Sequence, residues 1–204
     1  DLVTAVGYGA LSANTTAAYN AAYGYNALTA NTTGAGNNAF GARALDANTT
    51  GANNTAMGLD ALGAVTTGAG NTAIGTNAGD AISTGTNNAA MGFHALSSVT
   101  TAANNVGVGA YSGDAITTGA GNTLLGVNAG TTLTTGNNNI AVGLNALMSA
   151  TDGSHNHAVG DSSLGTLTTG QYNVGLGHYT GGLTTTPTFN VFVGHGAATT
   201  GTTG

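Results

Sequence analysis

A sizeable apolar residue recurs at every seventeenth position of this chain, and a glycine follows it each time. These apolar residues are Val6, Tyr23, Phe40, Met57, Ile74, Met91, Val108, Leu125, Val142, Val159, Leu176 and Val193. Twelve units of 17 residues account for all 204 residues, without one insertion or deletion. Repetition at a fixed short period is typical of solenoids, in which each repeat stacks on the one before it.

The repeat predicts the coil of an all-β, parallel β-solenoid. Seventeen residues are too few for the helix pair of a helical repeat. Gly and Asn are also frequent within each unit, and each Gly would cost a helix about 1 kcal/mol relative to Ala. We therefore expect two or three short strands per coil, joined by glycine-containing corners. Coils stacked about 4.8 Å apart would form a rod of roughly 57 Å, and residues 1–204 form a single repeat array.

Size patterns within the unit predict which side chains fill the coil. We number positions 1 to 17, with position 1 at Asp1 and every seventeenth residue after it. We expect position 6 to point inward, with position 4 on the same face of its strand. Positions 11 and 14 form the opposite wall, because their sizes compensate: Leu28 accompanies Asn31, whereas Gly79 accompanies Ile82. A fixed internal volume admits one large side chain, not two.

Asparagine occupies position 3 in every unit except the first. Its side-chain amide has donors and an acceptor, so stacked copies can hydrogen-bond from coil to coil as a ladder, and Asn also suits a turn. We expect both roles and no ligand. The ladder residues are Asn20, Asn37, Asn54, Asn71, Asn88, Asn105, Asn122, Asn139, Asn156, Asn173 and Asn190.

Small residues at position 5 predict a contact between copies of the chain. If positions 4 and 6 face inward, position 5 faces outward. A flat apolar strip exposed along a rod indicates an interaction surface, and we expect a second copy of the chain to cover it. The predicted oligomer seam consists of Ala5, Ala22, Ala39, Ala56, Ala73, Ala90, Gly107, Ala141, Ala158 and Gly175, and is interrupted by Leu124 and Phe192.

The composition excludes several classes of function. One Lys or Arg cannot neutralise a nucleic-acid backbone or dock the chain on anionic lipid. The absence of Cys removes disulfides and thiolate metal sites, and no apolar run is long enough to insert in a membrane. Charged residues make up 4% of the chain, which leaves little acid–base material for an active site. We expect neither an enzyme nor a cofactor.

One set of residues invites a metal hypothesis. Asp161, His178 and His195 share position 8 in successive units, so stacking would place them about 4.8 Å apart. They are candidates for a shared metal ion or a hydrogen-bonded row. The alternative is that all three are solvated side chains on an outward column, and spacing alone favours that alternative.

The unit also resembles known fibre repeats. The segments Asn71-Thr72-Ala73-Ile74-Gly75 and Asn139-Ile140-Ala141-Val142-Gly143 resemble short repeats in the head domains of trimeric autotransporter adhesins. The run from Asn54 to Leu62, followed by Thr66-Thr67-Gly68, resembles repeats in phage tail-fibre proteins. The resemblance implies a left-handed parallel β-roll, assembled as a homotrimer, that forms the shaft or head of an attachment fibre. Because the chain begins and ends within the repeat, we expect a fragment of a longer fibre.

Two functions follow as hypotheses. The first is a structural and adhesive fibre segment, extracellular, on a cell surface or virion, whose partners are copies of itself and cell-surface carbohydrate. Its receptor-facing aromatic residues would be Tyr8, Tyr25, Phe93, Tyr111, Tyr172, Tyr179 and Phe189. The alternative is an ice-binding β-solenoid that uses its columns of Thr at positions 15 and 16. Adjacent residues of a strand point to opposite faces, however, which leaves one outward column of Thr.

Overall fold

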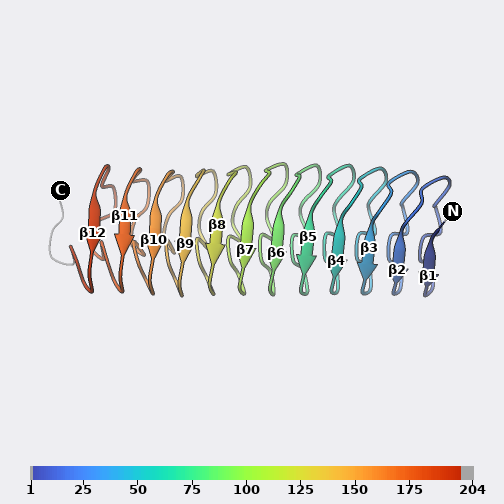
Figure 1. Ribbon diagram of the computed structural model, residues 1–204, viewed down its shortest axis with the longest axis horizontal. Helices are drawn as coiled ribbons and strands as arrows, with labels where there is room; N and C mark the ends of the chain where they lie inside the picture. The colour runs from blue at the N-terminus through green and yellow to red at the C-terminus, as the bar shows by residue number, and fades with distance from the viewer. Residues whose placement is uncertain (1, 199–204) are drawn as a thin grey trace.

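A computed structural model of the chain describes residues 2–198 as a stack of β-strands. The strands are β1 (Thr4–Val6), β2 (Ala21–Tyr23), β3 (Asn38–Phe40), β4 (Thr55–Met57), β5 (Thr72–Ile74), β6 (Ala89–Met91), β7 (Val106–Val108), β8 (Thr123–Leu125), β9 (Ile140–Val142), β10 (His157–Val159), β11 (Val174–Leu176) and β12 (Val191–Val193). They form one 12-stranded sheet in sequential order, with β1 and β12 at opposite ends of the rod (Figure 1). The expected all-β, parallel β-solenoid with 17-residue coils is confirmed.

Pairing in the sheet follows the repeat without a shift. Thr72, Ala73 and Ile74 of β5 pair in parallel with Ala89, Ala90 and Met91 of β6, and every neighbouring pair of strands repeats this offset. Each coil nevertheless contains one three-residue strand, not the two or three we expected. Outside the named strands of residues 2–198, an isolated bridge joins Gln171 to Thr188.

Left-handed backbone explains why the strands are so short. In the β6 coil, Asn87, His94 and Leu96 at positions 2, 9 and 11 have φ of 57°, 53° and 50°. Such residues interrupt extended structure and turn the chain tightly. The turns are still bonded from coil to coil: Asn87 N donates to Ala69 O at 3.0 Å, and Gly79 N donates to Ala95 O at 2.9 Å. The rod is thus hydrogen-bonded around much of each coil, and not only along the sheet.

The strands face the opposite way from our expectation. Position 5 lies in the core, where Ala73 and Ala90 are completely buried, whereas Ile74 and Met91 at position 6 point outward and are exposed. Position 4, on the same face as position 6, is half-buried or exposed. The assignment of positions 4 and 6 to the interior was therefore wrong by one residue, which inverts the whole strand. The interior has room beside the strand for little more than a methyl group in most coils.

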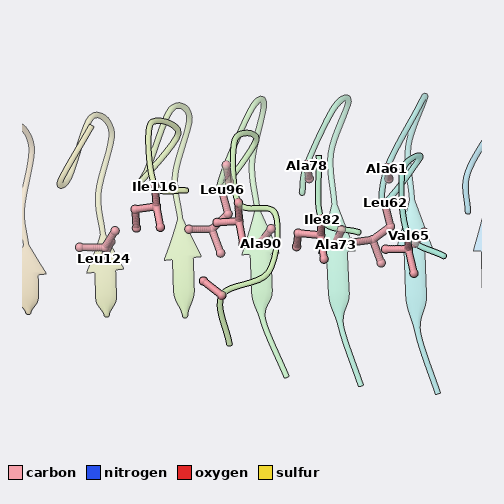
Figure 2. Packing of buried hydrophobic residues seen from close by; sticks show 14 of the residues in the cluster. Ala61, Leu62, Val65, Ala73, Ala78, Ile82, Ala90, Leu96, Ile116 and Leu124 are labelled. Carbon is pink, nitrogen blue, oxygen red and sulfur yellow. The ribbon is translucent and has the colours of Figure 1, made fainter. Parts of the chain in front are cut away.

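Positions 11 and 14 fill that interior, as predicted. Leu62 and Val65 are completely buried in the β4 coil, and Ile82 is buried in the β5 coil (Figure 2). At Gly79, a Cβ atom would stand 2.9 Å from Ile82 Cδ1 and 3.0 Å from Leu62 Cδ2. The alternation of Leu and Gly at position 11 thus follows the volume already taken by neighbouring side chains.

The same rule explains the two large residues at position 5. Leu124 lies between two glycines at position 11, where a Cβ on Gly113 would come 2.6 Å from Leu124 Cδ1 and one on Gly130 would come 2.9 Å from Leu124 Cδ2. A Cβ on Gly181 would likewise stand 3.4 Å from Phe192 Cδ2. Leu124 is therefore a core-filling residue beside glycines at position 11, Phe192 packs half-buried against the core beside Gly181, and neither interrupts a surface strip.

The asparagine ladder at position 3 is confirmed. Asn105 Nδ2 donates to Gly119 O at 2.9 Å, and Asn105 Oδ1 accepts from Asn122 N at 3.0 Å and from Asn122 Nδ2 at 3.1 Å. Equivalent bonds from the amide to the corner carbonyl run from Asn20 to Asn173, and the backbone bond between ladder residues continues to Asn190. The ladder therefore ties each coil to the next and also closes the corner within its own coil.

Candidate functional site

The outward face of the twelve-stranded sheet is the most distinctive surface of the rod. We define the sheet face as the residues at positions 4 and 6 of every coil. Side chains at position 6 are exposed by between 36% at Val108 and 63% at Val193, except Val142, which is half-buried. Large apolar residues are normally covered in a soluble monomer, and contiguous exposed patches mark interaction sites.

The sheet face is largely apolar at position 6 and mixed at position 4, where Thr, Asn38 and His157 occur beside Ala, Val and Ile. Positions 4 and 6 carry no Asp, Glu, Lys or Arg, and their ionisable side chains are the His157 imidazole of β10 and the Tyr23 phenol of β2. The rings of Tyr23 and Phe40 stack at 4.8 Å with an interplanar angle of 7°. The exposed column at position 8 continues this apolar surface in some coils, with Leu59, Val127 and Leu144.

The predicted seam at position 5 is wrong, because its residues lie in the core. Ala22, Ala39, Ala56, Ala73, Ala90, Gly107, Ala141, Ala158 and Gly175 are buried, and Ala5 is exposed within the first coil. A small residue is required where Leu96 and Leu164 reach across the coil: a Cβ on Gly107 would lie 2.8 Å from Leu96 Cγ, and one on Gly175 would lie 2.7 Å from Leu164 Cγ. A column of small residues indicates tight packing on either side of a strand, and here the packing is internal.

The candidate metal residues come together only in part. His178 Nε2 lies 3.5 Å from Asp161 Oδ2, and the rings of His178 and His195 are 5.0 Å apart. Asp161 Oδ1 also accepts a hydrogen bond from Ser162 Oγ at 2.8 Å. No group of three or more His, Cys, Asp or Glu within residues 2–198 is arranged to hold a metal ion. The geometry supports a surface row of polar side chains.

Acidic residues lie on columns away from the sheet face. Arg43 Nε and Nη2 donate to the two carboxylate oxygens of Asp60 at 2.6 and 2.5 Å. Burial raises the pKa of Asp46, and the nearby Asp60 carboxylate raises it further. Burial likewise raises the pKa of Asp80. These carboxylates occupy positions 9 and 12, outside positions 4 and 6 of the sheet face, whereas Asp161 lies at position 8.

The aromatic residues at positions 2 and 9 stack along the rod. Tyr172 lies between His155 and Phe189, with ring centroids at 4.8 and 5.0 Å and nearly parallel planes. His94 stacks on Tyr111 at 5.7 Å. Both faces of the Tyr172 ring are therefore occupied, which leaves its edge and hydroxyl for any contact with a ligand.

The two columns of Thr differ in what their hydroxyl groups do. At position 15, Thr32 Oγ1 donates to Thr49 O at 3.0 Å, and Thr134 Oγ1 donates to Thr151 O at 3.1 Å. At position 16 the side chains are exposed from Thr16 to Thr186. The first column binds the coils together, and the second is exposed in every coil that the structure describes.

Comparison of the chain with protein-family models, curated protein sequences and solved structures finds no match. Within residues 2–198 there is no helix with the length and apolar character needed to cross a bilayer. The sheet face and the surface columns of the coil are therefore the features on which a functional proposal can be based.

Proposed function

We propose that this chain is a non-catalytic structural segment of an extracellular attachment fibre, such as a phage tail fibre or a bacterial surface adhesin. The observation that carries the proposal is the unbroken stacking of identical-length coils in one register, from β1 to β12 (Figure 1). A rod of this kind keeps its two ends a fixed distance apart and transmits force along its axis, and it needs no globular core to do so.

Hydrogen bonds between coils support a mechanical role. The sheet, the asparagine ladder and the position-15 hydroxyls each join a coil to its neighbour. Because these interactions repeat along different sides of the coil, bending the rod would strain several of them together. A stiff spacer is what an attachment fibre requires.

Assembly with further copies of the chain is part of the same proposal. The resemblance described above implies three copies, and the apolar sheet face supplies a surface that an isolated rod would leave in water. Receptor contact, with cell-surface carbohydrate as the expected ligand, is assigned to the exposed aromatic residues at positions 2, 8 and 9. Tyr8 and Phe189 are the most exposed of these, at 79% and 75%.

The arrangement of Thr supports this proposal over the ice-binding alternative. A flat ice-facing plane needs ranks of outward hydroxyl groups, whereas position 15 donates its hydroxyls to backbone carbonyls. The column at position 16, which is exposed in every described coil, remains. An absence of thermal hysteresis at millimolar protein would agree with the fibre, and clear hysteresis would favour ice binding.

Sedimentation equilibrium tests the fibre proposal directly. We expect a mass that is a multiple of the 19.4 kDa chain at micromolar concentration, threefold in the proposed arrangement. Electron microscopy of the same sample should show rods of roughly 57 Å for twelve coils. A monomer at every concentration up to millimolar would contradict a fibre built from several chains.

A further inference from the structure

We infer that the β1, β2 and β3 coils form a separate cooperative unit, which opens before the rest of the rod at the boundary between the β3 and β4 coils. We call residues 2–51 the first segment, and the contact between residues 35–51 and 52–68 the joint. The inference goes beyond the proposed function and does not depend on it, because it concerns bonds within one chain. It gives the rod a defined place at which it yields.

The core of the first segment differs from that of the later coils at position 14. Asn14, Asn31 and Asn48 occupy this position in the first three coils, whereas the later described coils hold Val, Ile, Leu, Ala or Thr. Asn31 and Asn48 are completely buried. A buried amide needs hydrogen bonds inside the coil, and its net contribution to stability is smaller than that of an aliphatic side chain in the same space.

The hydrogen bonds of this amide row stop at the joint. Asn31 Nδ2 donates to Asn14 Oδ1 at 3.2 Å, and Asn48 Nδ2 donates to Asn31 Oδ1 at 2.8 Å. The equivalent place in the next coil is taken by Val65, which has no donor (Figure 2). Among residues 2–198, Asn48 Oδ1 is the one buried side-chain oxygen or nitrogen without a hydrogen-bond partner. The joint therefore carries the desolvation penalty of an unsatisfied acceptor.

The asparagine ladder at position 3 is also weaker up to the joint. From Asn71 to Asn190, each ladder residue donates from Nδ2 to Oδ1 of the preceding one. Asn37 and Asn54 are bonded to the preceding ladder residue through the backbone N alone, at 2.8 and 2.9 Å. The joint thus lacks a bond between side-chain amides at position 3 as well as at position 14.

A contact on the surface spans the same joint. Arg43, the one Lys or Arg of the chain, donates from the β3 coil to both carboxylate oxygens of Asp60 in the β4 coil. The pair is largely solvated, so it adds little to stability. Backbone bonds cross the joint as well, with Gly58 N donating to Phe40 O at 2.8 Å. The closed rod is therefore continuous, but buried side chains add less to this contact than they do farther along.

Hydrogen exchange of matched amides tests the inference. Gly41 N donates to Tyr23 O at 2.8 Å, and Gly160 N donates to Val142 O at 2.8 Å. Both glycines occupy position 7, in the third coil from either end of the twelve, so simple fraying would affect them alike. We expect Gly24 and Gly41 to exchange together, about tenfold faster than Gly160 or more, because they belong to one opening unit. Equal exchange of Gly41 and Gly160 would overturn the inference.

A hydroxyl group placed across the joint provides a second test. Val65→Thr keeps the shape of the side chain and offers a donor to Asn48 Oδ1. It should raise the protection of Gly41 about fivefold or more, because a buried acceptor gains its partner. Val99→Thr is the matched control, since Val99 is also completely buried at position 14 and lies in a later coil, away from Asn48. It should leave Gly41 unchanged and lower the protection of the amides around Val99.

The two measurements identify the cause of an early opening. If the first segment exchanges rapidly and Val65→Thr does not slow it, the unsatisfied acceptor does not set the stability of the joint, and the inference is wrong. Circular dichroism of both variants verifies that the coils remain folded. A chain that proves monomeric would contradict the fibre proposal and leave this inference standing, because exchange within one chain requires no second copy.

Discussion

Position 7 is the residue at which the chain leaves the sheet, and its geometry admits only glycine. Gly75 has a φ of 132°, and a Cβ atom placed on it would stand 2.6 Å from Gly92 O in the next coil. Neither the backbone angle nor the neighbouring carbonyl can adjust independently, because Gly92 N is bonded back to Ile74 O at 2.8 Å. The unvarying glycine thus reflects both positive φ and the close approach of adjacent coils.

Replacing Gly75 should therefore destabilise the rod strongly. We expect Gly75→Ala to lower the free energy of unfolding by about 2–4 kcal/mol, from left-handed strain and the clash with Gly92 O. Gly63→Ala is the control, since its Cβ would meet Asp60 O at 3.3 Å, with φ outside the left-handed region. Urea unfolding of the two variants measures the difference. Equal stability of the two would show that the corner has more freedom than its contacts imply.

Asp80 gives a residue-level prediction about pH. Burial raises its pKa in the folded chain, so ionisation costs more there than in the unfolded chain, and the ionised side chain lowers stability at neutral pH. Asp80→Asn should therefore be more stable than the parent at pH 7, by less than about 1 kcal/mol because the group is partly solvated. The gain should decline as the pH falls through the raised pKa and vanish near the ordinary value of about 3.9.

Thermal unfolding across this pH range would test the prediction. Asp152→Asn is the control, because the Asp152 carboxylate is exposed and accepts hydrogen bonds from Thr134 and Thr135. That substitution should bring no gain at pH 7. A gain at Asp80 that persists unchanged at pH 3 would mean that side-chain ionisation is not its cause.

At the scale of one coil, the sequence predicted the composition of the core better than the orientation of the strand. The sizes of pairs such as Gly79 with Ile82 led to the correct prediction that positions 11 and 14 fill the core, although Leu62 and Val65 show that one coil can bury two large side chains. The sequence did not show which face of β5 points inward, because side chains alternate with a period of two residues whichever face is buried. Large residues at position 6 and small ones at position 5 suggested that the larger column was internal. In a coil this narrow, Leu and Ile from the turns fill the interior, and only a methyl group fits from the strand.

A double substitution tests this account of the core. Leu62→Gly alone should create a cavity and cost about 3–5 kcal/mol, partly offset because Leu62 has a positive φ of 52°. Val65→Ile alone should overfill the coil and cost about 1–3 kcal/mol. Together they copy the Gly79 and Ile82 pair of the next coil, so the double variant should be at least 1 kcal/mol more stable than the sum of the single effects predicts. Additive costs in this double-mutant cycle would contradict volume compensation.

At the scale of the rod, the surface was harder to anticipate than the fold. The strict period was enough to predict a stack of coils, because every unit has the same length. The candidate site was not predicted, since the sheet face becomes apolar only once positions 4 and 6 are known to point outward. The prediction of the asparagine ladder was confirmed, and the prediction of the alanine seam was wrong. A buried amide needs hydrogen-bond partners whichever way its strand faces, whereas a methyl group suits a core and a surface equally well.

A rod held together by contacts between neighbouring coils should tolerate the loss of whole coils. Deletion of residues 69–102 removes two units and places Gly113 and Ile116 on Leu62 and Val65, just as Gly79 and Ile82 lie on them in the intact chain. We expect the shortened chain to fold, with a rod about 10 Å shorter by small-angle X-ray scattering. Deletion of residues 69–101 is the control, since the retained Ala102 leaves one coil a residue too long and forces a bulge. Its melting temperature should be several degrees lower, and equal melting temperatures would mean that the constant unit length is not required by the stack.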